Sequence, residues 1–175
     1  QPQEAPPPAS DASGQWLILA DQQGVGQQLA DLLAGQGGHC TLVFAGESYE
    51  QLDVKTFTVV PAAAEHFREL MQQISANTPP LRGLVHLWGL DEPQEITQAD
   101  LVESTRRGCA TVLPLLQSAI ATQVSPPPAL WLVTRAAQAV RDDLSAVAQA
   151  PLWGLGRVIA LERRHAEAHL NRGAA

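Results

Sequence analysis

The chain has 175 residues, 45% of them hydrophobic, which is enough for one folded domain with a sizeable core. Asp and Glu outnumber Lys and Arg by 18 to 11, and the net charge of -7 argues against a nucleic-acid partner, because no basic cluster is present to neutralise phosphates. No apolar run approaches the ~20 residues that cross a bilayer, and the N-terminus lacks a signal-peptide pattern, so we expect a cytoplasmic protein with no membrane partner.

Residues 1–14 are rich in Pro, Ala, Ser and Gln and show no apolar periodicity, which is typical of an extended linker. From Trp16 onward, short β-like runs alternate with helical patterns. This alternation predicts an α/β fold with a mainly parallel sheet covered by helices. The predicted strands are 16–20, 39–45, 56–60, 83–88 and 129–134.

The first two predicted helices have clear apolar faces. One begins at Val25 and is stopped by the glycines at 35, 37 and 38, and the other covers residues 63–76. The predicted buried face of the first is Val25, Leu29, Leu32 and Leu33. The predicted buried face of the second is Phe67, Leu70, Met71 and Ile74.

Two further helices are predicted at 97–122 and 151–162. Pro114 is expected to bend the first of them, and Pro151 opens the second, at a position where a missing amide costs little. The apolar stripe of the 97–122 helix is Leu101, Val102, Thr105, Cys109, Val112, Leu116 and Ile120. Because one crossover helix is missing between the second and third strands, we expect a truncated Rossmann-like three-layer fold.

The stretch ADQQGVGQQLADLL, residues 20–33, follows the first strand where a dinucleotide-binding fold has its glycine-rich turn. Gly24 and Gly26 supply two of the three glycines of either common fingerprint. In Gly-x-x-x-Gly-x-Gly the first place falls on Ala20, and in Gly-x-Gly-x-x-Gly the last place falls on Leu29. The two glycines are therefore weak candidates for cofactor binding, and close packing of strand against helix is the favoured explanation of them.

Charges near this turn also argue against a cofactor. Asp21 places a carboxylate where phosphates would meet the helix N-terminus, and a like charge opposes anion binding. At the end of the second strand, residues 44–47 contain no cation for the ribose phosphate of NADP, although Glu47 would suit the ribose of NAD. We expect no cofactor to be bound by this chain.

No catalytic residues are predicted. A short-chain reductase needs a Tyr-x-x-x-Lys pair, but the single tyrosine, Tyr49, has Asp53 at the fourth following position, and the single lysine is Lys55. Ser48 follows Gly46 and Glu47 without the second glycine that a serine hydrolase elbow requires.

No metal site is predicted either. His165 and His169 have the i, i+4 spacing that zinc enzymes use, but no Glu directly follows His165 and the surrounding tail is polar, so a solvated helix end is favoured. His86 lies in a predicted central strand and is interpreted as a buried, hydrogen-bonded histidine. His39 and His66 are interpreted as surface residues.

Cysteine and tryptophan residues are assigned to the core. Cys40 and Cys109 have no metal-ligand spacing and are expected to be reduced, mostly buried thiols. The four tryptophans stand in or beside apolar runs, so core positions are favoured over a docking face. They are Trp16, Trp88, Trp131 and Trp153.

Three segments resemble signature segments of the ketoreductase region of modular polyketide synthases, in its N-terminal structural subdomain. They are LRGLVHLWGLD (81–91), ALWLVTRAAQAV (129–140) and QAPLWGLGRVIALE (149–162), and the first strand and helix also fit, so that the resemblance covers residues 16–162. It implies that residues 15–162 form a non-catalytic, truncated Rossmann-like half. After Glu162 the family continues with a turn and a strand that this chain lacks, so residues 163–175 are a tail or a junction to a following domain such as an inserted enoylreductase.

The resemblance also implies partners. In that family the second half holds NADPH, carries the catalytic residues, and reduces a β-ketoacyl chain on an acyl carrier protein. This chain would support that half and neighbouring synthase domains.

Two other interpretations stay open. One is a self-sufficient NAD(P)-dependent short-chain oxidoreductase, and the other is a non-catalytic dimerisation or docking module. An exposed Trp153, or an exposed apolar face on the 97–122 helix, is expected for a docking role.

Overall fold

The computed structural model describes residues 12–76, 79–91, 98–123, 125–135 and 150–172. Within the two longest helices, the side chains of residues 98–107 and 163–172 lie outside this description. The elements along the chain are β1 Gly14–Leu19, α1 Val25–Gly35, β2 Gly38–Ala45, β3 Glu50–Asp53, β4 Thr56–Val59, α2 Ala64–Ser75, β5 Leu81–His86, the 3-10 helix η1 Trp88–Asp91, α3 Gln98–Ala121, β6 Ala129–Leu132 and α4 Ala150–Arg172.

The sheet has six strands in the order β3-β4-β2-β1-β5-β6. All neighbouring strands are parallel except β3 and β4, which form an antiparallel hairpin. The predicted α/β fold with a mainly parallel sheet is confirmed. Along the chain, β3 stands between β2 and β4, where the sequence predicted that a crossover helix would be missing.

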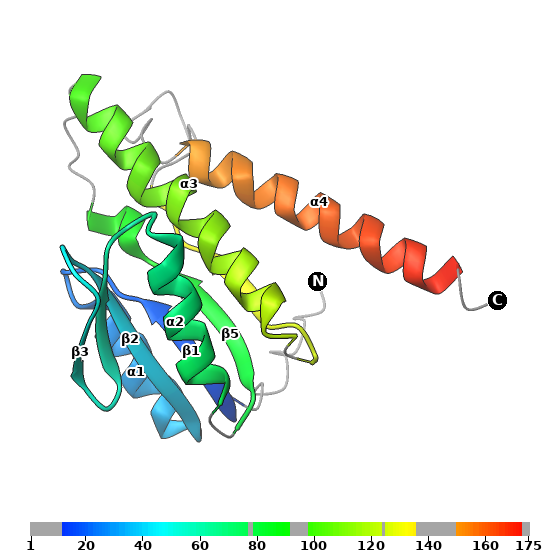
Figure 1. The fold of residues 1–175 in the computed structure, drawn as a ribbon, viewed down its shortest axis with the longest axis horizontal. Coiled ribbons are helices and arrows are strands. Elements are labelled where there is room, and N and C mark those ends of the chain that lie inside the picture. Colours follow the sequence, from blue (N-terminus) through cyan, green and yellow to red (C-terminus); the bar gives the residue numbers. More distant parts are fainter. Residues whose placement is uncertain (1–11, 77–78, 92–97, 124, 136–149, 173–175) are drawn as a thin grey trace, which may run out of the picture.

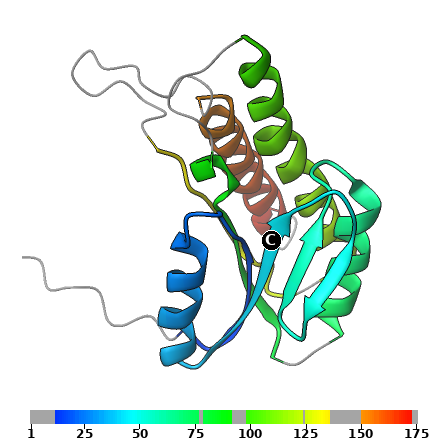
Figure 2. The ribbon, with the colours of Figure 1, turned by 90° about the vertical axis from the view of Figure 1, so that its left-hand side faces the viewer.

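Helices cover the two faces of the sheet unequally. Figures 1 and 2 place α1 alone on one face and α2 and α3 on the other, with α4 beside α3. The resulting three layers match the predicted architecture. None of the described helices is both long and apolar enough to cross a membrane.

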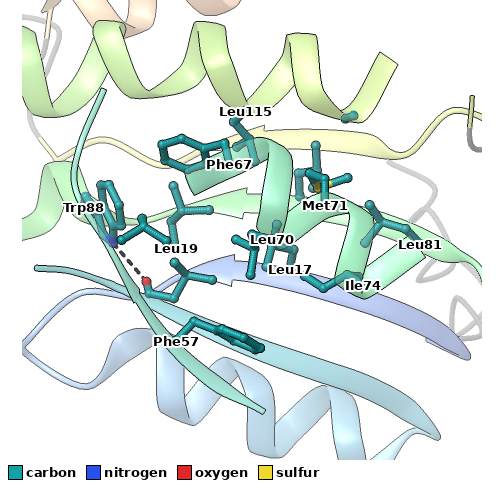
Figure 3. Close-up of a cluster of buried hydrophobic side chains, with 14 residues drawn as sticks. Leu17, Leu19, Phe57, Phe67, Leu70, Met71, Ile74, Leu81, Trp88 and Leu115 are labelled. Carbon is teal, nitrogen blue, oxygen red and sulfur yellow. Dashed lines mark hydrogen bonds between the residues drawn. The ribbon is translucent and has the colours of Figure 1, made fainter. Parts of the chain in front are cut away.

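The larger core cluster lies between the sheet and helices α2 and α3 (Figure 3). All four predicted apolar residues of α2 are buried in it, namely Phe67, Leu70, Met71 and Ile74. The Trp88 ring completes this cluster, and its Nε1 donates a hydrogen bond of 3.1 Å to the Val43 carbonyl of β2 (Figure 3). This bond ties η1 to the sheet.

The predicted face of α1 was partly wrong. Val25 and Leu32 are 40% and 67% exposed, whereas the buried residues of this helix are Gly26 and Ala30. Small residues occupy the contact face because α1 lies very close to the sheet. The predicted Leu29 and Leu33 do pack against the smaller core cluster on this side.

The predicted stripe of α3 was also partly wrong. Val112 is fully buried, but Ile120 is 75% exposed, and Leu115 and Ala119 face the core instead. The first members of the predicted stripe lie among the side chains that are not described. Pro114 lies inside an α3 that runs on to Ala121, and the predicted helix 151–162 is part of α4, which continues to Arg172.

Candidate functional site

The glycine turn between β1 and α1 has the local geometry of a nucleotide-binding turn. Gly24 has a φ of +90°, a left-handed conformation that favours glycine. Gly26 lies against the end of β1, and a Cβ built on it would come within 2.7 Å of the Ala20 Cβ. Close approach of helix and strand therefore accounts for Gly26, as the sequence predicted, whereas backbone conformation accounts for Gly24.

The carboxylate of Asp21 accepts hydrogen bonds from three backbone amides of this turn. Its Oδ1 accepts a hydrogen bond from the Gly26 amide at 2.7 Å, and its Oδ2 accepts bonds from the amides of Gln23 at 3.1 Å and Val25 at 3.2 Å. Asp21 is only 1% exposed. Since Val25 and Gly26 begin α1, this carboxylate caps the positive end of the helix from inside the protein.

A second carboxylate and a side-chain amide close the turn from the side of η1. The Gln22 amide donates to Asp91 Oδ1 at 2.8 Å, and Gln23 Nε2 donates to the Leu90 carbonyl at 2.7 Å. The turn is thereby fixed to η1 as well as to α1. The amides of residues 22, 23, 25 and 26 thus donate to the carboxylates of Asp21 and Asp91.

This arrangement opposes the binding of a diphosphate at the turn. Dinucleotide-binding folds use free amides at the helix N-terminus to hold pyrophosphate. A phosphate here would compete with Asp21 for the same amides and would face its negative charge at close range. The sequence predicted the unfavourable charge, and the structure adds the hydrogen bonds that hold it in place.

The end of β2 offers little for a ribose. Gly46 lies against β4, where an added Cβ would come within 3.0 Å of the Thr58 side chain. Glu47 is exposed, and residues 44–47 contain no basic side chain. The predicted lack of a cation for a ribose phosphate at residues 44–47 is thus a property of the sequence itself.

Tyr49 is half-buried and packs against the larger core cluster. Its hydroxyl lies 3.1 Å from Gln73 Oε1 and donates to it, while its ring lies 5.6 Å from the His66 ring. Burial, and to a smaller extent the Glu69 carboxylate, raise the pKa of the Tyr49 phenol. A general acid that works with a neighbouring lysine needs the opposite shift, so this environment does not activate Tyr49.

The other candidate residues of the region make local structural bonds. Ser48 Oγ donates to Glu50 at 2.6 Å, and the Lys55 amide donates to Asp53 Oδ1 at 2.8 Å in the turn between β3 and β4. That amide bond is the first cause of the lowered pKa of Asp53. These contacts stabilise the hairpin.

The histidines and cysteines are dispersed over the fold. His86 is fully buried at the end of β5 with its ring 5.8 Å from that of Trp88, His39 is exposed, and His66 Nδ1 accepts a bond of 3.1 Å from the Val60 amide. His165 and His169 fall among the side chains outside the described part. In the part of the chain that the structure does describe, no three His, Cys, Asp or Glu residues gather as metal ligands.

Both cysteines are free thiols. Cys40 is buried and Cys109 is half-buried, and burial raises the pKa of each thiol. Reactive cysteines have lowered pKa values, so neither thiol has the environment of a nucleophile.

Assignment of all four tryptophans to the core was wrong for two of them. Trp88 is buried, but Trp131 is 43% exposed and Trp153 is 38% exposed. The Trp131 ring lies 5.2 Å from that of Trp16, and Arg157 covers Trp153 at 4.9 Å. Periodicity in the sequence did not distinguish these exposed rings from core rings, because apolar neighbours surround both kinds.

The sequence is similar to one protein family and to two polyketide synthases. The family model described as "Beta-ketoacyl synthase-like, N-terminal" matches residues 14–149. Two polyketide synthases of Streptomyces halstedii are similar in sequence. GfsA is 32% identical over 160 residues, and the match covers 89% of this chain but 2% of the length of GfsA. GfsB is 31% identical over 166 residues, and the match covers 89% of this chain but 3% of the length of GfsB. The chain thus spans a very small share of the length of these relatives.

Solved structures share the fold. One of them is a multidomain structure with adenylation, ketoreductase and pseudo Asub domains from a keto acid-selecting NRPS module. It superposes with a TM-score of 0.73 at 21% identity, and the match covers 81% of this chain and 12% of the solved chain. A short-chain dehydrogenase from Shigella flexneri has a TM-score of 0.66 at 19% identity, and the match covers 87% of this chain and 69% of the dehydrogenase. At these identities the likeness establishes the Rossmann-like fold.

Proposed function

Because this chain belongs to the family described as "Beta-ketoacyl synthase-like, N-terminal", and is similar to polyketide synthases over most of its length, we propose that it is the non-catalytic structural half of a ketoreductase. Its parent would reduce a β-ketoacyl chain, bound to an acyl carrier protein, to the β-hydroxyacyl product. The NADPH and the catalytic residues would belong to the other half. The whole parent would work in the cytoplasm, as the sequence predicts.

The observation that carries the proposal is the Asp21 carboxylate. It accepts hydrogen bonds from three amides of the turn that would otherwise hold a diphosphate. The fold keeps the shape of a nucleotide-binding unit while its own anion fills the binding turn. The position of Tyr49 agrees with this, because its hydroxyl is bonded to Gln73 and its pKa is raised.

Reconstitution with the catalytic half tests this function. We expect the catalytic half of the same synthase, expressed alone, to reduce a carrier-bound or thioester β-ketoacyl substrate poorly, and addition of this chain to raise its activity and its melting temperature. This chain alone should produce no NADPH oxidation. Reduction by this chain alone would instead support a self-sufficient oxidoreductase.

A non-catalytic docking module is the second candidate function. It is favoured by the apolar side chains that α3 and α4 leave exposed, among them Ile120 and Val158. Light scattering separates the two proposals. A structural half should be monomeric until its partner is added, whereas a dimerisation module should be dimeric by itself.

A further inference from the structure

Two tryptophan rings meet on the α1 face of the sheet, toward its β6 edge. The centroids of the Trp16 ring on β1 and the Trp131 ring on β6 are 5.2 Å apart, and Trp16 packs against the smaller core cluster beside α1. Gly83 of β5 lies between the two strands, and a Cβ built on it would come within 2.6 Å of both rings. The rings thus adjoin over a position that has no side chain, and they are called the tryptophan pair below.

One ring of the tryptophan pair is open to solvent. Figure 2 shows α1 on this face of the sheet, where it packs on β1 and β2. Since β6 is the last strand of the sheet, Trp131 lies beyond the cover of this helix and is 43% exposed. Exposed tryptophan is enriched at binding surfaces, because a large rigid ring offers much contact area.

The N-terminal part of the chain enters the fold beside the tryptophan pair. Trp16 Nε1 donates a hydrogen bond of 2.9 Å to the Ala12 carbonyl, and Ala12 is 2% exposed. The Arg82 guanidinium donates to the next carbonyl, that of Ser13, at 3.1 Å. The path of the chain is therefore fixed as far as Ala12, at the edge of the Trp16 ring.

The Trp131 ring leans toward the end of the sheet at which the chain enters. Trp131 pairs with Val85 in the register of β5 and β6, yet its ring lies against the Cβ position of Gly83, nearer the start of β5. Because β1, β5 and β6 are parallel, this is also the end at which β1 begins. Residues that precede Ala12 thus start next to both rings.

A run of three prolines, residues 6–8, stands a short way before Ala12. In a polyproline II conformation each residue advances about 3.1 Å, so Pro8 lies about 12 Å along the chain from Ala12. Trp16 is bonded to Ala12 directly, and the Trp131 ring is only 5.2 Å farther on. The proline run is therefore within reach of the whole tryptophan pair.

We propose that the proline run at residues 6–8 adopts a polyproline II conformation and packs on the tryptophan pair. Proline-rich segments bind aromatic surfaces because their conformation is already restricted in the free chain, so little entropy is lost on binding. The inference does not depend on the proposed function. It gives the N-terminal segment, which the sequence predicted to be an extended linker, a binding site on its own domain.

Tethering favours this segment over other occupants. A short flexible connection keeps a segment at an effective concentration on the order of millimolar near its site. The tether here runs only from Ala12 to the proline run, and Ala12 is itself held at the Trp16 ring. A second copy of this chain, or a proline-rich segment of another protein, would have to reach a similar concentration to compete.

The first test observes the rings in the full chain labelled with 5-fluorotryptophan, by fluorine NMR. Single Trp→Phe variants assign the four resonances. Replacement of residues 6–8 by serine should shift the Trp131 resonance and raise its solvent isotope shift, because the ring becomes more exposed. Trp153, 38% exposed on α4, is the internal control and should not shift. Replacement of residues 1–3 by serine is the matched control and should leave all four resonances unchanged.

The second test observes the segment itself. A glutamate-specific protease cuts after Glu4, next to the proline run, and mass spectrometry measures the rate. Trp131→Ala should speed this cleavage about 3- to 10-fold, the factor expected for the loss of one aromatic contact, whereas Trp153→Ala should not. The sequence around Glu4 is the same in these proteins, and cleavage after the exposed Glu47 should proceed at one rate in all of them.

The two tests together decide the proposal. A Trp131 resonance that shifts on replacement of residues 6–8, with faster cleavage after Glu4 in Trp131→Ala alone, supports it. An unchanged Trp131 resonance and isotope shift overturn it, whatever the stability of Trp131→Ala. The same shift on replacement of residues 1–3 overturns the role of the prolines. A Trp131 resonance that depends on protein concentration instead assigns the tryptophan pair to a second copy, which also overturns the proposal.

Discussion

Removing the Asp21 carboxylate tests its role as the cap of the glycine turn. Asp21→Ala leaves three amides without their acceptor, and the Gly26 amide is buried, where water cannot easily replace it. Loss of a capping side chain costs about 0.5–2 kcal/mol. Loss of a negative charge at the helix N-terminus costs about 0.3–1 kcal/mol more. Because Asp21 is 1% exposed, we expect the upper part of this range, a decrease of about 2–3 kcal/mol in the free energy of unfolding.

The assay is urea unfolding followed by circular dichroism. Asp21→Asn keeps one oxygen acceptor but loses the charge, so it should lose about half as much stability as Asp21→Ala. Asp31→Ala is the matched control on the same helix, because the bond that Asp31 accepts from Gln27 is exposed, and it should change stability by less than about 0.5 kcal/mol. Equal stability of Asp21→Ala and the wild type would refute the capping role.

Three more predictions concern close contacts and titration. Gly26→Ala should destabilise the fold by about 1–3 kcal/mol in urea unfolding, because its Cβ would lie 2.7 Å from the Ala20 Cβ, whereas Gly35→Ala, with open space around it, should not. Gly83→Ala should shift the tryptophan fluorescence and lower the melting temperature, since an added Cβ meets two tryptophan rings at 2.6 Å; an unchanged spectrum would contradict this packing. Tyr49, the single tyrosine, has a raised pKa, so ultraviolet titration should find it less than half ionised at pH 10.0. Half ionisation below that pH would contradict the assigned environment.

The parts of the fold that were predictable share a simple sequence signal. The face of α2 was predicted correctly because its four apolar residues stand in a polar helix with no competing stripe. The family resemblance deduced from the segments at 81–91, 129–140 and 149–162 is confirmed by the family model and by the polyketide synthase relatives. Long, specific segments carry this kind of information even where single glycines do not.

The parts that were missed depend on contacts that periodicity does not encode. Strand β3 was not predicted, because all four of its residues are exposed and its pairing comes from the hairpin with β4. On α1 the contact face is formed by Gly26 and Ala30, small residues whose role is visible only once the helix lies on the sheet. The exposed Ile120 has the same helical spacing as a core residue, so the sequence placed it in the core.

The charge at the candidate site could be predicted from the sequence, but its hydrogen-bond partners could not. The sequence placed an acid in the glycine turn and predicted that it opposes a phosphate. Only the structure identifies which amides the Asp21 carboxylate engages, and that Asp91 and Gln23 join the turn to η1. These bonds link residues up to 69 positions apart, beyond the reach of a local motif.

Calorimetric titration of this chain with NADPH tests the central claim most directly. The claim is that the Asp21 carboxylate already holds the amides that a dinucleotide needs. The predicted result is no saturable heat up to about 1 mM NADPH, well above the micromolar affinities of cofactor sites. Saturable binding at micromolar concentration, with Gly24 and Gly26 protected from hydrogen exchange in the complex, would contradict it.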